Sequence, residues 1–138
     1  MTRINLVPVS ELSDQHLIAE YRELPRIFNL VLNAQYKGKY PFDFKISDTY
    51  LLGTGHVTFF YDKLIFLQRR LREITKECIK RKFNIANKND YSLALFNKEW
   101  LNDYIPTSKE IEISRGRIQE KLNSRQNFYK YYGKPYIN

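Results

Sequence analysis

The chain has 138 residues, a formal net charge of +8 and a sequence pI near 9.5. Its length predicts one domain, 1–138, that buries a core without disulfides or a structural metal. No apolar run approaches the roughly 20 residues of a membrane span, and the N-terminus lacks the regions of a signal peptide, so we expect a cytoplasmic protein that contacts no membrane.

The positive charge, combined with 11 tyrosines, indicates the class of partner. Such basicity is unusual for an enzyme of neutral metabolites and common for a protein that acts on a polyanion. Tyrosine rings stack on bases and their hydroxyl groups reach phosphates. We therefore expect nucleic acid, and a basic protein whose aromatic residues merely fill its core is the alternative.

The chain opens MTRIN, which places a small residue, Thr2, after the initiator methionine. The bacterial rule for methionine removal predicts that Thr2 becomes the mature N-terminus. An α-amino group has a pKa of about 7.7–8.0, against about 10.4 for lysine, so a useful fraction is neutral near pH 7 and nucleophilic. Thr2 is therefore a candidate nucleophile, although most such termini serve no function.

The first predicted helix begins after a cap at Ser13 or Asp14 and continues to the mid-thirties. Pro25 should bend or loosen it, because proline lacks the N–H group that an interior position donates. Steps of four and three residues predict one buried stripe, formed by Leu17, Tyr21, Leu24, Phe28 and Val31.

Arg22, Glu23 and Arg26 lie on neighbouring parts of the opposite face of this helix. Two arginines there suit phosphates around a lesion, with Glu23 handling cationic charge or a proton. The alternative is a surface ion-pair ladder that contributes a few tenths of a kcal/mol.

A second helix is expected from about Asp62, its N-cap, to Lys82. Its buried stripe comprises Leu64, Leu67, Leu71, Ile74 and Cys78, so the single cysteine is predicted to be a core residue rather than a nucleophile. Basic residues dominate the predicted outer face, namely Lys63, Arg69, Arg70, Arg72, Lys76, Lys80, Arg81 and Lys82. Part of this face is expected to be simply solvated, but its sign bias suggests nearby phosphates.

A third helix should follow Pro106, because Thr107 and Glu110 have the spacing of a capping box. Its inward positions are Ile111, Ile118 and Leu122. The run VTFFY, between the first and second predicted helices, has the composition of a β-strand, but the sequence offers no convincing partner strand. The predicted fold class is therefore all-α, with three main helices.

The C-terminal run RQNFYKYYGKPYIN interleaves cations with aromatic rings and contains no acid. Phe128, Tyr129 and Lys130 are its candidate DNA-binding residues, since this pattern suits partly unstacked bases. The alternative is a tail that packs its rings across the helices, and alternate residues allow both.

The sequence lacks the residue patterns that metal-dependent, nucleotide-binding and serine-nucleophile enzymes require. His16 and His56 have no ligand-spaced companions, the acids are scattered, and no phosphate-binding Gly-rich loop or Gly-x-Ser-x-Gly motif occurs. We therefore expect no metal and no cofactor.

Several blocks of sequence together resemble the phage endonuclease V family of pyrimidine-dimer DNA glycosylase/AP lyases. They are MTRINL, VSEL, DQHL, AEYRELPR, DFKIS, GHVTFFYDK, RKFNI, DYIP and FYKYYGK. The resemblance runs from end to end, whereas segments 29–42 and 86–100 differ and a family tryptophan is replaced by Phe128. It implies helices around a threaded N-terminus, and a monomer that acts on double-stranded DNA containing pyrimidine dimers or abasic sites.

The resemblance also implies the roles of individual residues. The amine of Thr2 attacks C1′ of the 5′ nucleotide of the dimer, an imine forms, and β-elimination cuts the strand, while Glu23 stabilises the cationic sugar and assists proton removal at C2′. The duplex is kinked and the adenine opposite the dimer is extruded. The residues implied to bind the phosphates and the lesion, or to lie close by on the DNA face, are Arg3, Gln15, His16, Arg22, Arg26, Arg117 and Lys121.

Two other functions stay open at this point: a non-catalytic DNA-binding protein of the same fold, and an RNA-binding or nucleoid-packaging protein.

Overall fold

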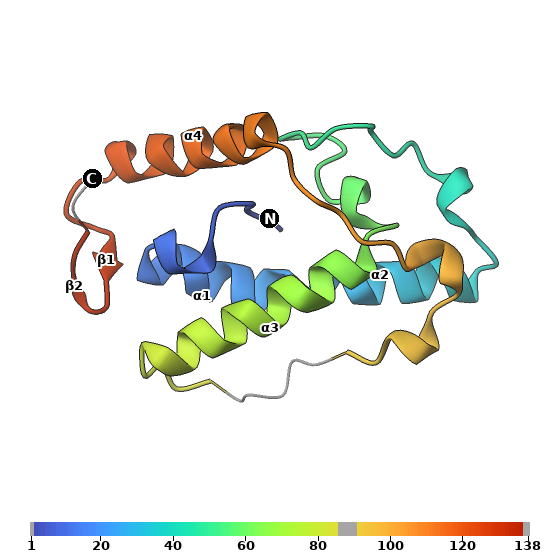
Figure 1. Ribbon diagram of the computed structural model, residues 1–138, viewed down its shortest axis with the longest axis horizontal. Coiled ribbons are helices and arrows are strands. Elements are labelled where there is room, and N and C mark those ends of the chain that lie inside the picture. Colours follow the sequence, from blue (N-terminus) through green and yellow to red (C-terminus); the bar gives the residue numbers. More distant parts are fainter. Residues whose placement is uncertain (1, 86–90, 137–138) are drawn as a thin grey trace.

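The computed structural model describes residues 2–85 and 91–136, and helices dominate it (Figure 1). The α-helices are α1 (Asp14–Glu23), α2 (Pro25–Tyr36), α3 (Leu64–Lys80) and α4 (Ser108–Ser124). Single 3-10 turns connect them: η1 (Val9–Glu11), η2 (Pro41–Asp43), η3 (Thr58–Phe60), η4 (Leu93–Leu95) and η5 (Lys98–Trp100). The strands are β1 (Lys130–Tyr131) and β2 (Lys134–Pro135), which pair antiparallel. This small hairpin does not change the fold class, and the all-α prediction is confirmed.

The predicted first helix begins where expected but is divided into α1 and α2 at Leu24. The hydroxyl of Ser13 caps α1 by accepting a hydrogen bond from the backbone N–H of His16 at 3.1 Å. Pro25 occupies the first position of α2, where its missing N–H breaks no intrahelical bond. The expected stripe is buried across both helices, so the single continuous helix is wrong, while the loosening of the helix at Pro25 and the buried face are confirmed.

The predicted second helix corresponds to α3, and its stripe from Leu64 to Cys78 is buried as expected. Burial raises the pKa of the Cys78 thiol to about 11, in keeping with a core residue. The cap at Asp62 is wrong: the residue that precedes the helix is Lys63, whose ammonium donates to Asp62 Oδ1 at 2.8 Å. The Asp62 carboxylate thus binds Lys63 and does not cap the helix.

Two cations assigned to the outer face of α3 are in fact buried, and that part of the prediction is wrong. Arg70 and Arg81 are only 5% and 6% exposed. Both lie at the edge of the apolar stripe and meet carboxylates, Glu20 for Arg70 and both Asp14 and Glu77 for Arg81. A buried guanidinium requires such partners, because an unpaired charge is costly to remove from water.

The predicted third helix is α4, which begins with the expected capping box. The Thr107 hydroxyl accepts from the N–H of Glu110 at 3.1 Å, and the Glu110 carboxylate accepts from the N–H of Thr107 at 3.0 Å. Ile118 and Leu122 are buried and Ile111 packs against the core. The VTFFY segment forms η3 rather than a strand.

The N-terminal segment, residues 2–12, lies in the space between α4 on one side and α1 with α3 on the other (Figure 1). Ile4 and Leu12 are fully buried in the main hydrophobic core, together with residues from every long helix. The predicted threading of the N-terminus between the helices is therefore confirmed. No helix within residues 2–85 and 91–136 has the length and apolar character to span a bilayer.

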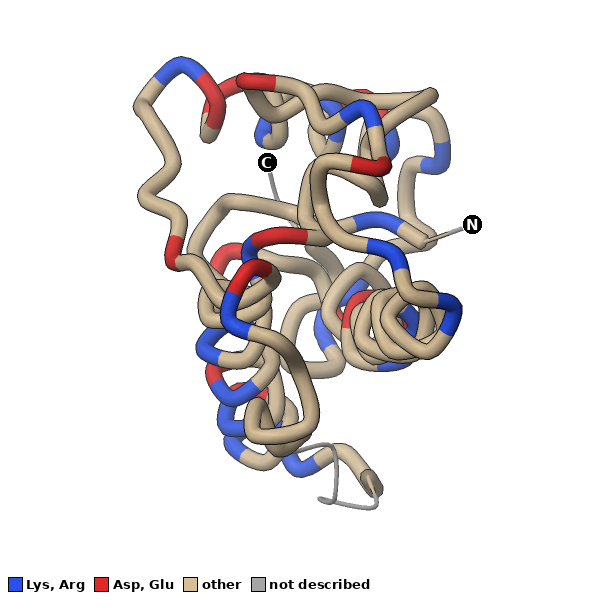
Figure 2. The backbone as a smooth tube through the Cα atoms, turned by 90° about the vertical axis from the view of Figure 1, so that its right-hand side faces the viewer, with Lys and Arg blue, Asp and Glu red and all other residues tan. Residues whose placement is uncertain are grey.

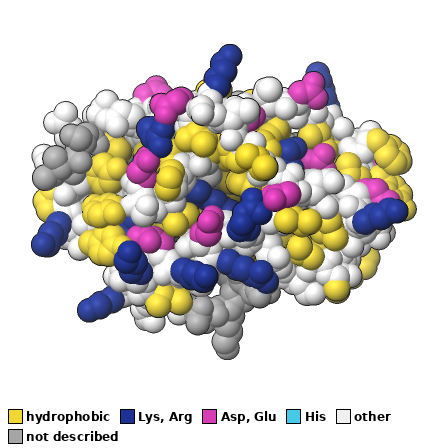
Figure 3. All heavy atoms as spheres, viewed as in Figure 1, with side chains coloured by type: hydrophobic (Ala, Val, Ile, Leu, Met, Phe, Trp, Pro, Cys, Tyr) yellow, Lys and Arg dark blue, Asp and Glu magenta, His cyan; other side chains and the backbone are white. Residues whose placement is uncertain are grey.

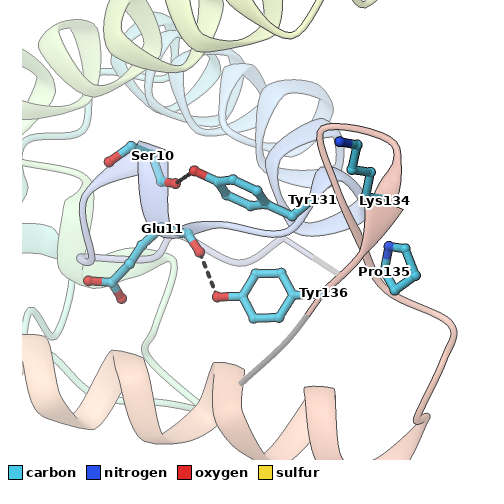
Figure 4. Close-up of a pocket in the computed structure, with 6 residues that line it drawn as sticks. All are labelled: Ser10, Glu11, Tyr131, Lys134, Pro135 and Tyr136. Atoms are coloured by element: carbon cyan, nitrogen blue, oxygen red, sulfur yellow. Dashed lines mark hydrogen bonds between the residues drawn. The ribbon is translucent and has the colours of Figure 1, made fainter.

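The C-terminal tail folds back as a hairpin with its two-residue turn at Tyr132 and Gly133, which have φ of 52° and 79°. Two positive φ values identify the turn type that matches strand twist in short hairpins. Tyr131 and Tyr136 point from the hairpin towards η1, where their hydroxyls donate to the carbonyls of Ser10 at 2.8 Å and Glu11 at 2.9 Å (Figure 4). Some of the tail's aromatic side chains, Tyr131 and Tyr136 among them, thus attach the tail to η1.

Candidate active site

The backbone of the N-terminal segment is held mainly by side chains, because it has no neighbouring strand. The N–H of Ile4 donates to Nε2 of His56 at 2.9 Å, and the opposite ring nitrogen, Nδ1, lies 2.7 Å from the carbonyl of Leu51. A carbonyl only accepts, so Nδ1 carries the proton and Nε2 is free to accept. Burial lowers the pKa of His56, which favours this neutral form.

The next residues of the segment are fixed by α4 and by the loop that precedes η3. The hydroxyl of Ser114, fully buried on α4, accepts from the N–H of Leu6 at 2.9 Å. The hydroxyl of Tyr50 donates to the carbonyl of Ile4 at 2.8 Å. Backbone groups that would otherwise be buried without partners are therefore satisfied, which fixes the path of the chain towards its N-terminus.

A buried ionic cluster anchors the segment to α1 and α3. Glu20 is 1% exposed and accepts from Nε of Arg70 at 2.7 Å and from the side-chain amide of Asn5 at 2.8 Å. Arg70 also donates to the carbonyl of Val7. Because every member has partners, the cluster places the segment at one position relative to both helices.

Glu23, at the end of α1, contacts the first described residues directly. Its Oε1 atom accepts from the backbone N–H of Arg3 at 2.9 Å. Thr2 immediately precedes Arg3, so this bond places the carboxylate beside the residue predicted to carry the reactive amine. The geometry thus brings Thr2 and Glu23 together.

A cleft of about 270 Å³ opens at this point, between α1, the N-terminal segment and α4. Its lining includes five of the predicted site residues, Arg3, His16, Glu23, Arg117 and Lys121. The remaining lining residues are Asn5, Ala19 and Glu20. Burial and the nearby charge of Arg3 lower the pKa of Arg117, which indicates how closely the cations are gathered.

His16 forms the edge of the cleft towards the tail. Its ring stacks on Tyr129 with centroids 4.7 Å apart, and Nδ1 lies 2.8 Å from the hydroxyl of Ser13. Burial, followed by the charges of Arg117 and Lys121, lowers the pKa of His16 to about 4. The imidazole is therefore neutral at physiological pH and adds no charge to the cleft.

Arg22 and Arg26 are exposed on the adjacent surface of α1 and α2. Neither pairs with a carboxylate in the part of the chain that the structure describes, and Glu23 is turned towards Arg3. The surface ion-pair ladder is therefore not formed. Both guanidinium groups remain available to an anionic ligand.

Gln15 joins this surface to the tail. Its side-chain amide donates to the carbonyl of Phe128 at 2.8 Å and accepts from the N–H of Lys130 at 2.9 Å. Phe128 is 40% exposed, and the guanidinium of Arg125 lies 3.8 Å from its ring centroid. The tail thus reaches the edge of the cleft, while DNA contacts by Gln15, Phe128, Tyr129 and Lys130 remain predictions.

Reasoning from the sequence missed the residues that hold the N-terminal segment. They are Asn5, Glu20, Tyr50, His56, Arg70 and Ser114. A signal existed for Glu20 and Arg70, since each is a charged residue at the edge of an apolar helical stripe. No comparable pattern marks the other four, because their partners lie far away in the sequence.

Within the described residues, no group of three or more His, Cys, Asp or Glu side chains could hold a metal ion. The cleft instead supplies one carboxylate beside the N-terminus and a set of cations. Its donors therefore suit a polyanion.

The comparison with known protein families shows the family of the chain. The model of a family described as pyrimidine dimer DNA glycosylase matches residues 1–90. This range includes Thr2, Glu23 and the arginines of α1 and α2, whereas α4 and the tail lie beyond it. The matched part also contains all of α3 and its anchor for the N-terminal segment. The chain therefore belongs to the pyrimidine dimer DNA glycosylase family, whose function is DNA repair.

Proposed function

We propose that this chain cleaves the glycosidic bond of the 5′ pyrimidine in a cyclobutane dimer and then nicks the DNA strand as an AP lyase. The observation that carries the proposal is the hydrogen bond between Glu23 Oε1 and the N–H of Arg3. It keeps a carboxylate next to Thr2, in a cleft otherwise dominated by positive charge.

In the proposed first step, the neutral amine of Thr2 attacks C1′ and forms a C–N bond while the glycosidic bond breaks. The bonding electrons leave with the base, which stays attached to its neighbour through the cyclobutane ring. Nearby cations favour the neutral amine, and Glu23 stabilises the positive charge that develops on the sugar. Ring opening then gives the imine.

In the second step, a base removes a proton from C2′ and the electron pair expels the 3′ phosphate. Glu23 is the group proposed to accept this proton, because it is the carboxylate that lies beside Thr2 in the described structure. Water then hydrolyses the imine, which releases the cleaved sugar and restores the free amine.

DNA is proposed to be held by Arg3, Arg117 and Lys121 inside the cleft and by Arg22 and Arg26 next to it. A neighbouring pocket of about 530 Å³ lies between Arg22 and the segment after α3, and Tyr21 contributes a hydroxyl that is buried without a partner in the described structure. We assign this pocket to the base extruded opposite the lesion, because it adjoins Arg22 and is lined by both polar and aromatic side chains.

Borohydride trapping on a duplex with a single cyclobutane dimer tests the mechanism. The processed enzyme should give a covalent adduct, and the same enzyme acetylated at Thr2 should bind the duplex without forming one. An adduct that persists after acetylation, or the absence of any adduct, contradicts the assignment of Thr2.

The same experiment separates the alternatives. A non-catalytic DNA-binding protein binds the damaged duplex but is never trapped. An RNA-binding or nucleoid-packaging protein shows no preference for the damaged duplex. Trapping on a duplex with a preformed abasic site tests the lyase step separately from base release.

A further inference from the structure

A second cationic surface lies on the exposed side of α3 and is not used by the cleft. Its basic residues are Arg69, Arg72, Lys76 and Lys80, and the only carboxylate exposed on the helix is Glu73. We call this set the α3 face. It differs from the predicted basic face because Arg70 and Arg81 are buried, and because Lys63 and Lys82 lie outside the helix.

Lys76 and Lys80 are the residues of the α3 face with no ion pair in the portion of the chain that the structure describes. Arg69, in contrast, forms a two-pronged pair with Asp103 at 2.7 and 3.1 Å. Lys76 and Lys80 are one helical turn apart, about 6 Å along the axis. Duplex DNA carries one negative charge per roughly 1.7 Å of its axis, so both ammonium groups reach phosphates of a single duplex.

The cleft is lined by the N-terminal segment, α1 and α4, and no residue of the α3 face is part of its lining. Glu20 and Arg70 make the contact between α1 and α3. At 100° per residue, Lys76 is about 120° and Lys80 about 80° from Arg70 around α3, so both lysines lie away from the contact with α1.

The pictures agree with this arrangement. Figure 3 shows Lys and Arg side chains along the lower part of the face on which α3 is the nearest helix in Figure 1. In Figure 2 the N-terminus lies on the right, and a column of Lys and Arg positions, interrupted by Asp and Glu positions, lies at the lower left. The basic residues of this column are thus separate from the N-terminus in that view.

We propose that the α3 face binds the phosphate backbone of a second DNA segment while the cleft is occupied, so that the protein passes directly between duplexes. The occupant is DNA because the family acts on DNA and because four of the exposed residues on this surface are cationic, which suits sequence-independent phosphate contacts. The inference rests on DNA as the partner and not on the chemistry proposed for Thr2.

The test measures dissociation of the enzyme from a labelled undamaged duplex as unlabelled duplex is added. Direct transfer makes the dissociation rate rise with competitor concentration. The double variant Lys76→Gln, Lys80→Gln should lose most of this rise and reduce the salt dependence of transfer by about two in log–log slope. Its single-turnover cleavage of a dimer-containing duplex should stay within about twofold of wild type, because neither lysine lines the cleft.

The matched control removes two exposed lysines elsewhere, Lys98→Gln with Lys109→Gln, and should keep the competitor dependence. A wild-type rate that ignores competitor, or an equal loss in the control, overturns the proposal. So does retained transfer accompanied by lost binding to vesicles of anionic lipid, because that result assigns the face to a membrane. Loss of trapping by Thr2 acetylation leaves the transfer result intact, so the two proposals fail separately.

Discussion

The N-terminal segment and the C-terminal tail both dock on α1 and α3, and each is secured by a buried arginine, one within α3 and one directly after it. Arg70 holds the N-terminal segment through Glu20 and the carbonyl of Val7. Arg81 holds the tail through Asp14, which also accepts from the N–H of Tyr132 at 3.0 Å. The two anchors are alike in chemistry.

The segments differ in how many sides hold them. The N-terminal segment is bonded by residues of α1, α3, α4 and the Tyr50–His56 loop, and its anchors are almost fully buried. The tail is bonded by η1, by the first turn of α1 and by Glu77 of α3, and residues 125–128 are exposed. A reactive amine requires one geometry, because a small displacement costs much of the rate. A surface that follows a kinked backbone tolerates a looser attachment.

The largest expected effect is at Glu23, where the N-terminal geometry meets the chemistry. Glu23→Gln keeps an oxygen for the N–H of Arg3, so the segment should stay in place while the negative charge is lost. Cleavage of a dimer-containing duplex should fall by roughly 10²–10⁴-fold, with binding retained in a gel-shift assay. The control is Glu120→Gln on the exposed face of α4. Near wild-type cutting by the Glu23 variant contradicts its assigned role.

The second effect concerns the anchor of the N-terminal segment. Arg70→Met leaves Glu20 buried without its main partner and should cost about 3–5 kcal/mol of unfolding free energy. Urea denaturation measures this, and the neighbouring Arg69→Met, which removes only an exposed pair, should cost under about 1 kcal/mol. Adding Glu20→Gln to Arg70→Met should recover part of the loss. Equal losses of unfolding free energy in Arg69→Met and Arg70→Met would mean that burial does not determine how much each arginine stabilises the fold.

Arg81→Met provides the matching change for the tail. It should destabilise the fold by a similar or slightly smaller amount, because Asp14 keeps the N–H groups of the turn as partners. The expected difference is in function: trapping on an abasic duplex at saturating enzyme should be close to wild type, while trypsin should cut after Lys130 faster. A trapping defect as large as that of Arg70→Met means that the tail, too, sets the reactive geometry.

The smallest effect is the pH dependence of stability. His16 and His56 both have lowered pKa values in the folded protein, whereas the unfolded chain takes up these protons at pH values near 6.5. Stability should therefore fall as the pH drops from about 6.5 towards about 4, by roughly 1 kcal/mol for the partly exposed His16. Urea midpoints at pH 7 and pH 5 measure the change, and His16→Gln should make it smaller. If the urea midpoint of His16→Gln changes with pH as much as that of the wild type, other groups cause the effect.

The helices could be predicted from the sequence because their signals are local. The stripes of α1 and α3, the Ser13 cap and the Thr107–Glu110 box each depend on residues within a few turns of one another. The break at Leu24 followed from Pro25, but its outcome as two helices did not, since packing on both sides determines whether a proline bends a helix or divides it. The Asp62 cap failed because Lys63 competes for the same carboxylate.

The sequence by itself determined the all-helical class, the basic and aromatic character and the candidate residues Thr2 and Glu23. Only the tertiary structure showed that Arg70 and Arg81 are internal anchors, that His56 and Ser114 fix the N-terminal backbone, and that Arg3, Arg117 and Lys121 line one cleft. The physical reason is the separation in sequence between the residues that interact. Helical periodicity is encoded within a few residues. The buried hydrogen bonds from Ile4 to His56 and from Leu6 to Ser114 join residues 52 and 108 positions apart, and no local sequence pattern indicates them.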